Sequence, residues 1–237
     1  MHIAILGEGA PPQTEQLLRK NGFCTVWLPR NPRLPAPVAG HPDLSVFFAP
    51  DAVFTTERYA VLAQRELAAV CRHIRLPLRT VTAEVGDRYP HDVLLDALPV
   101  GRRLFCLPDA TAHELTCHPG YRVIPVRQGY AKCAALPVGS NALASADPSI
   151  LIAAEREGLE TFALSPGGIR LSGYSTGFIG GAASCAPYES TDAVFFCGDP
   201  QLHPDGAALT AFLTAHGKTC HSLPGMPLTD IGTIFLI

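Results

Sequence analysis

The chain has 237 residues, of which 47% are hydrophobic and 16% charged, and its formal net charge at pH 7 is −3. This composition is typical of a globular protein that can bury a large core. The slightly acidic balance excludes the basic surface of most nucleic-acid-binding proteins, so we expect neither a nucleic-acid nor a membrane partner.

The start of the chain and the cysteines indicate the compartment. Residues 1–7 lack a basic segment followed by a long apolar core, so they do not form a signal peptide. No window approaches the roughly 18–20 apolar residues that a membrane span needs. Most of the eight cysteines lie within apolar segments, which favours reduced, buried thiols over disulfides. The sequence therefore predicts a cytoplasmic protein.

Taken in chain order, the predicted elements repeat one pattern. Residues 2–6, 11–20 and 23–28 predict a strand, a helix and a strand, and residues 31–40 predict an extended loop. From residue 41 each unit has polar residues, a short apolar strand, a turn, a return strand, a helix and a third strand. The helices are expected near 57–74, 109–120, 148–156 and 205–216. The units span about 41–88, 89–128, 129–176, 177–228, and 229–237 together with 1–40.

The spacing of these units predicts a closed ring. The polar openings at positions 43, 92, 132, 180 and 230 recur every 40 to 50 residues, a period typical of repeat architectures. The fifth unit is divided between the two ends of the chain, so the first and last strands should pair. We therefore expect one α/β domain over 1–237, a five-bladed ββαβ propeller closed by its N- and C-terminal strands.

The openings of the units carry the candidate functional residues. A ring would bring these openings together at its axis, where charges buried without partners would be costly. Carboxylates can hold a cationic group, a thiolate can attack its carbon, and an imidazole can move protons. The proposed catalytic residues are Cys133, His41 and His91, and the proposed substrate-binding residues are Asp43, Asp92, Lys132 and Asp230.

The predicted architecture resembles the pentein fold of guanidino-group-modifying enzymes, which include arginine deiminases, agmatine deiminases, dimethylarginine hydrolases and amidinotransferases. Residues 41–47, His-Pro-Asp-Leu-Ser-Val-Phe, are similar to the His-x-Asp-Thr-Val-Phe segment of arginine deiminases. That resemblance implies proton transfer by His41 and guanidinium binding by Asp43. Residues 89–93, 128–133 and 177–182 resemble more closely an uncharacterised bacterial pentein-like family.

The chain departs from the enzymes at the expected nucleophile. In those enzymes the reactive cysteine follows glycines in the last repeat, whereas the last opening here is Thr-Asp-Ile-Gly, residues 229–232. Two cysteines remain as candidates. Cys133 lies at an opening beside Lys132, whose charge could lower the pKa of the thiol. Cys185 follows a Gly-Gly pair but lies deeper along its strand.

Other interpretations of the chain stay open. On the same ring, a non-catalytic binding protein is the main alternative to a cysteine-dependent hydrolase or amidinotransferase for a small molecule. The ribosome anti-association factor of archaea and eukaryotes is one such pentein-like protein. Gly7 and Gly9 imitate the start of a dinucleotide-binding loop, but no third glycine follows at the required spacing. Residues 113–118 resemble a His-Glu-x-x-His zinc box with Cys117 in its fifth position. We expect no cofactor and no metal.

Overall fold

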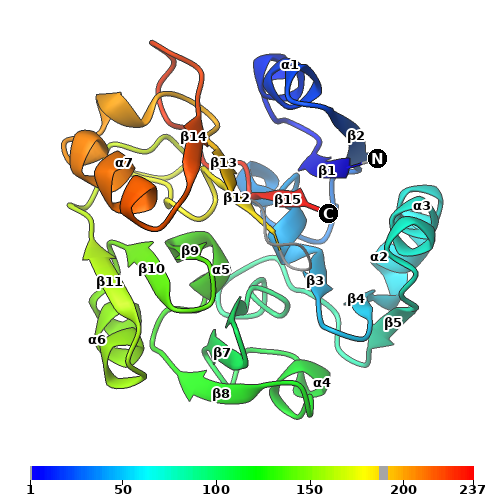
Figure 1. Cartoon of the computed structure of the whole chain (residues 1–237). Coiled ribbons are helices and arrows are strands. Elements are labelled where there is room, and N and C mark those ends of the chain that lie inside the picture. Colours follow the sequence, from blue (N-terminus) through cyan, green and yellow to red (C-terminus); the bar gives the residue numbers. More distant parts are fainter. Residues whose placement is uncertain (1, 187–191) are drawn as a thin grey trace.

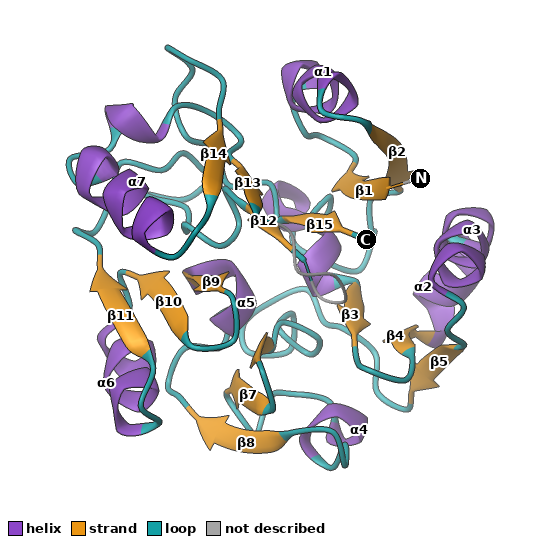
Figure 2. Ribbon diagram, viewed as in Figure 1, coloured by secondary structure: helices purple, strands orange, loops and turns teal. Residues whose placement is uncertain are grey.

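The computed structural model of the chain describes residues 2–186 and 192–237. It shows an α/β fold built from small sheets, with most of the helices on the outside of the molecule (Figure 1). The strands lie toward the centre, as colouring by secondary structure makes plain (Figure 2). In the described part of the chain one sheet has four strands and the others have two or three.

Three sheets share one topology, and each falls within one of the sequence units. In each of them an antiparallel hairpin is followed by a helix and by a third strand that pairs in parallel with the second. The parallel crossover explains why each unit needs a helix between its last two strands. The strands are β3 (Val46–Phe48), β4 (Val53–Thr56) and β5 (Leu78–Val81); β6 (Leu98–Val100), β7 (Arg103–Cys106) and β8 (Arg122–Pro125); and β9 (Ala135–Val138), β10 (Ala142–Ser145) and β11 (Glu160–Ala163).

The two ends of the chain meet in the four-stranded sheet. Its order is β12 (Ser184–Cys185), β15 (Ile234–Leu236), β1 (His2–Gly7) and β2 (Phe23–Leu28). β15 pairs antiparallel with β1, and both termini lie beside this sheet (Figure 1). The prediction that the first and last strands share a sheet is therefore confirmed.

The fourth unit differs from the expected pattern. Its strands β13 (Ala193–Phe195) and β14 (Thr219–His221) form a two-stranded parallel sheet. β12 pairs in parallel with β15 of the next unit, and an isolated bridge between Ala183 and Phe196 joins this segment to its own unit. The first strand of the fourth unit thus belongs to the sheet of the fifth.

The helices follow their sequence signals in most places. Asp147 caps α6 by accepting hydrogen bonds from the backbone N–H groups of Ser149 and Ile150, at 2.8 and 3.1 Å. The helix predicted over 57–74 is divided at Ala63, and only one turn forms in the range 109–120. The α-helices are α1 (Pro12–Lys20), α2 (Glu57–Leu62), α3 (Gln64–Ile74), α4 (His113–Thr116), α5 (Ala131–Ala134), α6 (Pro148–Arg156) and α7 (Gly206–Ala215).

The openings of the first and third units are helical turns rather than strands. A 3₁₀ turn, η2 (Pro42–Leu44), precedes β3, and α5 precedes β9. The strand predicted directly after Asp92 is also wrong, because residues 89–96 form turns and β6 begins only at Leu98. Two further 3₁₀ turns are η1 (Ala36–Val38) and η3 (Pro200–Leu202).

The core consists of apolar clusters that each join two neighbouring sheets. One cluster packs the first unit against the second, and further clusters connect the second to the third, the third to the fourth and the fourth to the fifth. A fifth cluster joins the sheet that holds both termini to the first unit. Examples in that order are Phe54 with Leu104, Phe105 with Leu143, Ala144 with Val194, Phe195 with Ile234, and Phe235 with Val53.

The expectations about the cysteines and about membrane spans can also be compared with the structure. Cys71, Cys106, Cys117, Cys133, Cys197 and Cys220 are free thiols, and Cys24 and Cys117 are exposed rather than buried. The side chain of Cys185 lies outside the described part of the chain. Among the described residues, every helix is too short or too polar to cross a membrane.

Candidate functional site

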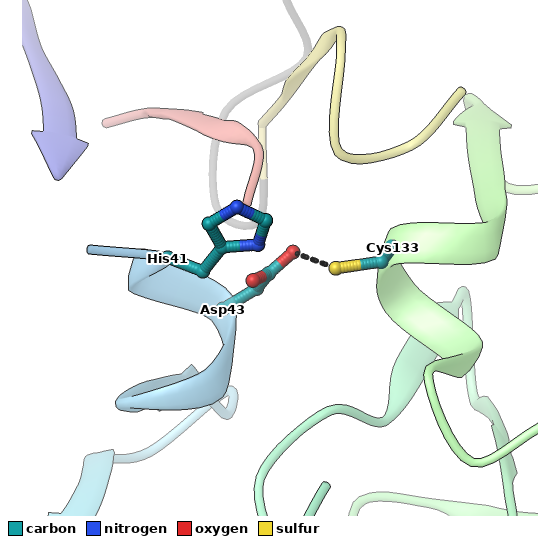
Figure 3. Close-up of side chains that lie close together, drawn as sticks. All are labelled: His41, Asp43 and Cys133. Carbon is teal, nitrogen blue, oxygen red and sulfur yellow. Dashed lines mark hydrogen bonds between the residues drawn. The ribbon is translucent and has the colours of Figure 1, made fainter. Parts of the chain in front are cut away.

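Three of the residues predicted from the sequence meet near the centre of the molecule. The Sγ atom of Cys133 donates a hydrogen bond to Oδ2 of Asp43 over 2.9 Å, and the imidazole of His41 lies beside this pair (Figure 3). A ring nitrogen of His41, a carboxylate oxygen of Asp43 and the Cys133 sulfur all lie within 4.8 Å of one another. All three residues are buried. We refer to His41, Asp43 and Cys133 as the central cluster.

Local sequence explains how these side chains are held. His41 is the residue before η2, and Pro42 occupies its first position, where a missing N–H costs nothing. Cys133 lies on α5, where Oδ1 of Asp96 accepts hydrogen bonds from the backbone N–H groups of Lys132 and Cys133, at 2.6 and 3.1 Å. Asp96 is completely buried and therefore fixes the position of the Cys133 backbone.

Asp230 adds a second buried carboxylate next to the central cluster. Its Oδ1 atom lies 3.8 Å from Nδ1 of His41 and accepts a hydrogen bond from the N–H of Gly232 at 3.0 Å. Its Oδ2 atom accepts another from the N–H of Phe178 at 2.9 Å. Among the described residues, Nδ1 of His41 has no hydrogen-bond partner. Asp230 is thus held by backbone donors and faces a ring nitrogen of His41.

Glycines allow the backbone to approach these side chains. A Cβ atom added at Gly181 would lie 1.9 Å from Oδ1 of Asp230, and one added at Gly232 would lie 2.3 Å from the Cβ of His41. Contacts this short do not occur between real atoms, so only glycine fits at either position. Close packing therefore requires glycine at Gly181 in the fourth opening and at Gly232 in the fifth.

Replacing Gly181 with alanine should therefore displace Asp230 and destabilise the protein. Overpacking of a rigid site typically costs about 1–3 kcal/mol, and the contact here is with a carboxylate that backbone donors hold in place. The midpoint of urea unfolding would measure the loss. Gly139→Asn is the control, because an added Cβ at Gly139 meets no atom within 4 Å and asparagine tolerates its positive φ. Equal stability of the two variants would contradict the packing argument.

Lys132 does not act on the thiol of Cys133, the next residue, as the sequence analysis expected. Its Nζ atom points away from the thiol and donates hydrogen bonds to Oγ1 of Thr233 at 2.9 Å and to the carbonyl oxygen of Gly180 at 3.5 Å. Within the described part of the chain, this ammonium makes no ion pair with a carboxylate. Thr233, which the sequence analysis did not single out, has an unusual φ of 72° that turns its hydroxyl to this contact.

Of His91 and Asp92 in the second opening, only Asp92 is buried. It accepts a hydrogen bond from the hydroxyl of Tyr130, and among the described residues its other oxygen has no partner. His91 is exposed, and the structure does not bring it to the central cluster. Burial, and then the hydrogen bond that its hydroxyl donates to Asp92, raise the pKa of Tyr130, so this phenol stays protonated at physiological pH.

Without a bound substrate, the electrostatics of the site disfavour the thiolate form of Cys133. Burial, followed by the neighbouring carboxylates of Asp43, Asp96 and Asp230, raises the pKa of the Cys133 thiol well above its usual range. The expectation that Lys132 lowers this pKa is therefore wrong. Burial is also the main cause that raises the pKa values of Asp96 and Asp230. The site therefore disfavours the charged forms of these acidic groups, and a bound cation would favour them.

This arrangement predicts an unusual pH dependence for alkylation of Cys133. A raised thiol pKa means that the proton is retained to higher pH, so the rate with a neutral reagent should still increase above pH 9. The same cysteine in the urea-unfolded chain should reach half of its maximum rate at a lower pH than in the folded protein, close to the ordinary thiol pKa of about 8.5. Mass spectrometry of the peptide that carries Cys133 measures both rates. A plateau below pH 8 in the folded protein would contradict the electrostatic account.

Access to the central cluster is narrow. A surface cleft of about 280 Å³ is lined by Glu8, Arg30, His41 and Asp230, among other residues, while Cys133 does not line it. On the other side, Asp43 and Lys132 line a cavity of only about 10 Å³, roughly the space of one water molecule. His41 and Asp230 therefore stand between the cleft and the thiol.

Two motifs noted in the sequence have structural explanations. An added Cβ at Gly7 would lie 1.7 Å from the carbonyl oxygen of Gly40, so close packing accounts for this glycine. The potential ligands of the zinc-like box, residues 113–118, do not come together at one site. His113 lies 3.5 Å from the Cys117 sulfur on the surface, whereas His118 is buried and bonds to Asp51 at 2.7 Å.

The chain belongs to a protein family whose model matches residues 5–235 and carries the description "Family of unknown function (DUF6873)". No curated protein matches the sequence. Among solved structures, SxtG, an amidinotransferase from Microseira wollei in the saxitoxin biosynthetic pathway, is similar with a TM-score of 0.47 and 10% sequence identity. The match covers 95% of this chain and 88% of SxtG. A likeness at this level establishes neither a shared fold nor a shared activity.

Proposed function

We propose that the chain is a cysteine-dependent enzyme that hydrolyses, or transfers a group from, a small molecule with a guanidino, amidino or ureido carbon. The observation that carries this proposal is the central cluster, in which the Cys133 sulfur lies 2.9 Å from Asp43 and within 4.8 Å of a His41 nitrogen. A nucleophile, a carboxylate and a proton-transfer group in contact are the minimum set for covalent catalysis.

We also propose that the fold is a five-bladed propeller of the pentein type. The repeated hairpin, helix and parallel strand in three units support it, and so does the pairing of β1 with β15. The apolar clusters support it further, because each joins one unit to the next and the last joins the fifth unit to the first. A central site is then the place where every unit contributes its opening.

The first chemical step uses the acidic side chains that lie around the Cys133 thiol. Asp43 and Asp230 hold the guanidinium or amidinium group, and its positive charge favours loss of the Cys133 proton. The thiolate adds to the central carbon, forming a carbon–sulfur bond and a tetrahedral intermediate. The intermediate then expels an amine, which takes up the thiol proton through His41. The products of this step are a cationic S-amidino adduct on Cys133 and a free amine.

The second step releases the adduct. Water adds to the adduct carbon, the carbon–sulfur bond breaks, and the water oxygen remains on the product as a carbonyl. One proton returns to the sulfur and one passes to His41 and the solvent, which balances the reaction. If an amine takes the place of water, the amidino group is transferred instead. His41 serves both steps because its Nδ1 atom makes no hydrogen bond with the described part of the chain.

Substrate binding requires the site to open. The cavity beside Asp43 holds about one water molecule, so a guanidinium group does not fit while His41 is in place. His41 lines the surface cleft, and rotation of its side chain would connect that cleft with the Cys133 sulfur. The proposed enzyme is therefore closed at rest, and the substrate displaces His41 from its resting position.

The test is direct detection of the covalent adduct. The protein is mixed with methylguanidine, agmatine or arginine, quenched in acid and analysed by intact and peptide mass spectrometry. The proposal predicts an added amidino or substituted amidino group on the peptide that carries Cys133, with release of an amine or ammonia. No adduct and no product across guanidino, amidino and ureido compounds, with folded protein throughout, would refute it.

A non-catalytic binding protein on the same fold is the second candidate, and the closed site favours it. A thiol that is 2% exposed and carries a raised pKa is a poor nucleophile at rest. In a non-catalytic binding protein, the buried carboxylic acids and Lys132 would fix the packing of the five units. The two candidates are separated by the fate of a bound guanidino compound, which the enzyme consumes and the binding protein leaves unchanged.

A further inference from the structure

We propose that His41, Asp43 and Cys133 together bind one divalent transition-metal ion of the Zn²⁺ type. Imidazole nitrogen, carboxylate oxygen and thiolate sulfur are the ligands that Zn²⁺ takes in proteins. The three donor atoms already lie within 4.8 Å of one another, although they come from two segments 90 residues apart in the chain. Small side-chain rotations would bring all three to a common centre.

Unpartnered polar atoms point to a missing ligand. Nδ1 of His41 and Oδ1 of Asp43 are buried and make no hydrogen bond with any described residue. Buried polar groups without partners are rare and costly, and a bound ion is one of the recognised ways to satisfy them. The hydrogen bond between Cys133 and Asp43 would be lost on binding, because the ion takes the place of the thiol proton. The metal forms a bond to sulfur and one proton is released to the solvent.

The surroundings favour a cation and provide a fourth contact. Asp96 is completely buried behind α5, and Asp230 lies 3.8 Å from His41. Asp230 can complete the coordination sphere or orient the imidazole as an outer carboxylate. Because His41 and Asp230 line the surface cleft of about 280 Å³, an ion can reach the site from solvent. A bound ion would occupy the sulfur and block attack by it.

The proposal does not depend on the enzymatic one, because binding can be measured without turnover. The purified full chain is stripped with a chelator and titrated with Co²⁺, which gives a near-ultraviolet charge-transfer band when a thiolate binds it. We expect one Co²⁺ per chain with this band, and its loss when Zn²⁺ is added in equal amount. Wild-type protein that gives no thiolate band would overturn the proposal.

Variants identify the site. Cys133→Ser should remove the band, and His41→Ala should weaken Co²⁺ binding by ~10-fold or more. The matched control is Cys117→Ser, which removes the surface thiol that lies 3.5 Å from His113 and should leave the band unchanged. A band that follows Cys117 instead of Cys133 would assign the metal to the surface pair and refute the central site.

A measurement on the wild-type chain tests the proposal without depending on whether the variants fold. Zn²⁺ should protect Cys133 from alkylation by chloroacetamide and slow its rate by at least ~10-fold at one equivalent. Partly exposed Cys71, a free thiol outside both candidate metal sites, serves as an internal reference for the reagent. Unchanged labelling of Cys133 in the presence of Zn²⁺ would refute the proposal, whatever the variants show.

Discussion

Replacing Cys133 with alanine is expected to lower turnover of a guanidino substrate by roughly 10⁴-fold or more, the scale seen when a covalent nucleophile is removed. The substitution removes the sulfur that forms the adduct and leaves Asp43 and His41 in place. Substrate binding should therefore survive, so the loss should appear in kcat rather than in KM. Steady-state kinetics of the variant and the parent would measure both constants.

The control for this result is Cys106→Ala. Cys106 is also a completely buried free thiol, but it lies on β7 outside the central cluster. Its replacement creates a comparable cavity and should leave kcat unchanged within a few-fold. If Cys133→Ala keeps more than a few per cent of the parent activity, another group is the nucleophile. Cys185 would then be the first residue to examine, as the alternative that the sequence offers.

Deleting the last four residues should unfold the protein. Residues 234–237 form β15 and its end, and Ile234, Phe235, Leu236 and Ile237 are all at least 95% buried. Full burial of such a side chain contributes about 1.5–3 kcal/mol, so four of them match the whole stability of a typical domain, about 5–15 kcal/mol. The deletion also exposes β1 and β12, which β15 joins. Circular dichroism and thermal unfolding would show the loss.

A circular permutant is the matched control. A short Gly-Ser linker joins residue 237 to residue 2, and new ends are opened at the exposed turn of residues 139–141. Because β15 and β1 are adjacent and antiparallel, this chain keeps every strand and should remain folded with a Tm within a few degrees of the parent. A stable deletion variant, or a permutant that fails to fold, would contradict the proposed closure through β1 and β15.

The repeat could be predicted because it depends on signals between residues that are close together in the sequence. Apolar strands, turn residues and capped helices recur at a regular interval, and the completion of the last unit by the first residues follows from counting units. Asp147 before Pro148 is a helix start that needs no tertiary information, and the structure shows the expected cap. The pairing of β1 with β15 was therefore accessible from the sequence alone.

The details of the site could not be predicted because distant residues decide them. Four residues of α5 are too few to show helical periodicity, and their backbone is fixed by Asp96, which lies 36 positions earlier. The direction of Lys132 is set by Thr233, 101 positions away. His91 and His41 occupy similar places in their units, yet only His41 is buried. Local sequence indicates that a polar residue is present but not which way it points.

The most direct test of the central claim compares two alkylating reagents of the same shape. Chloroacetamidine is a planar cation, whereas chloroacetamide is neutral. Because buried carboxylates surround the Cys133 sulfur, the cation should be held beside it and should modify it at least ~100-fold faster, a difference of about 2.7 kcal/mol. Peptide mass spectrometry would follow Cys133 and exposed Cys117 in one experiment. Selective modification of Cys133 by the amidine, with little preference at Cys117, is the predicted result, and equal rates of both reagents at Cys133 would contradict a cation site at the thiol.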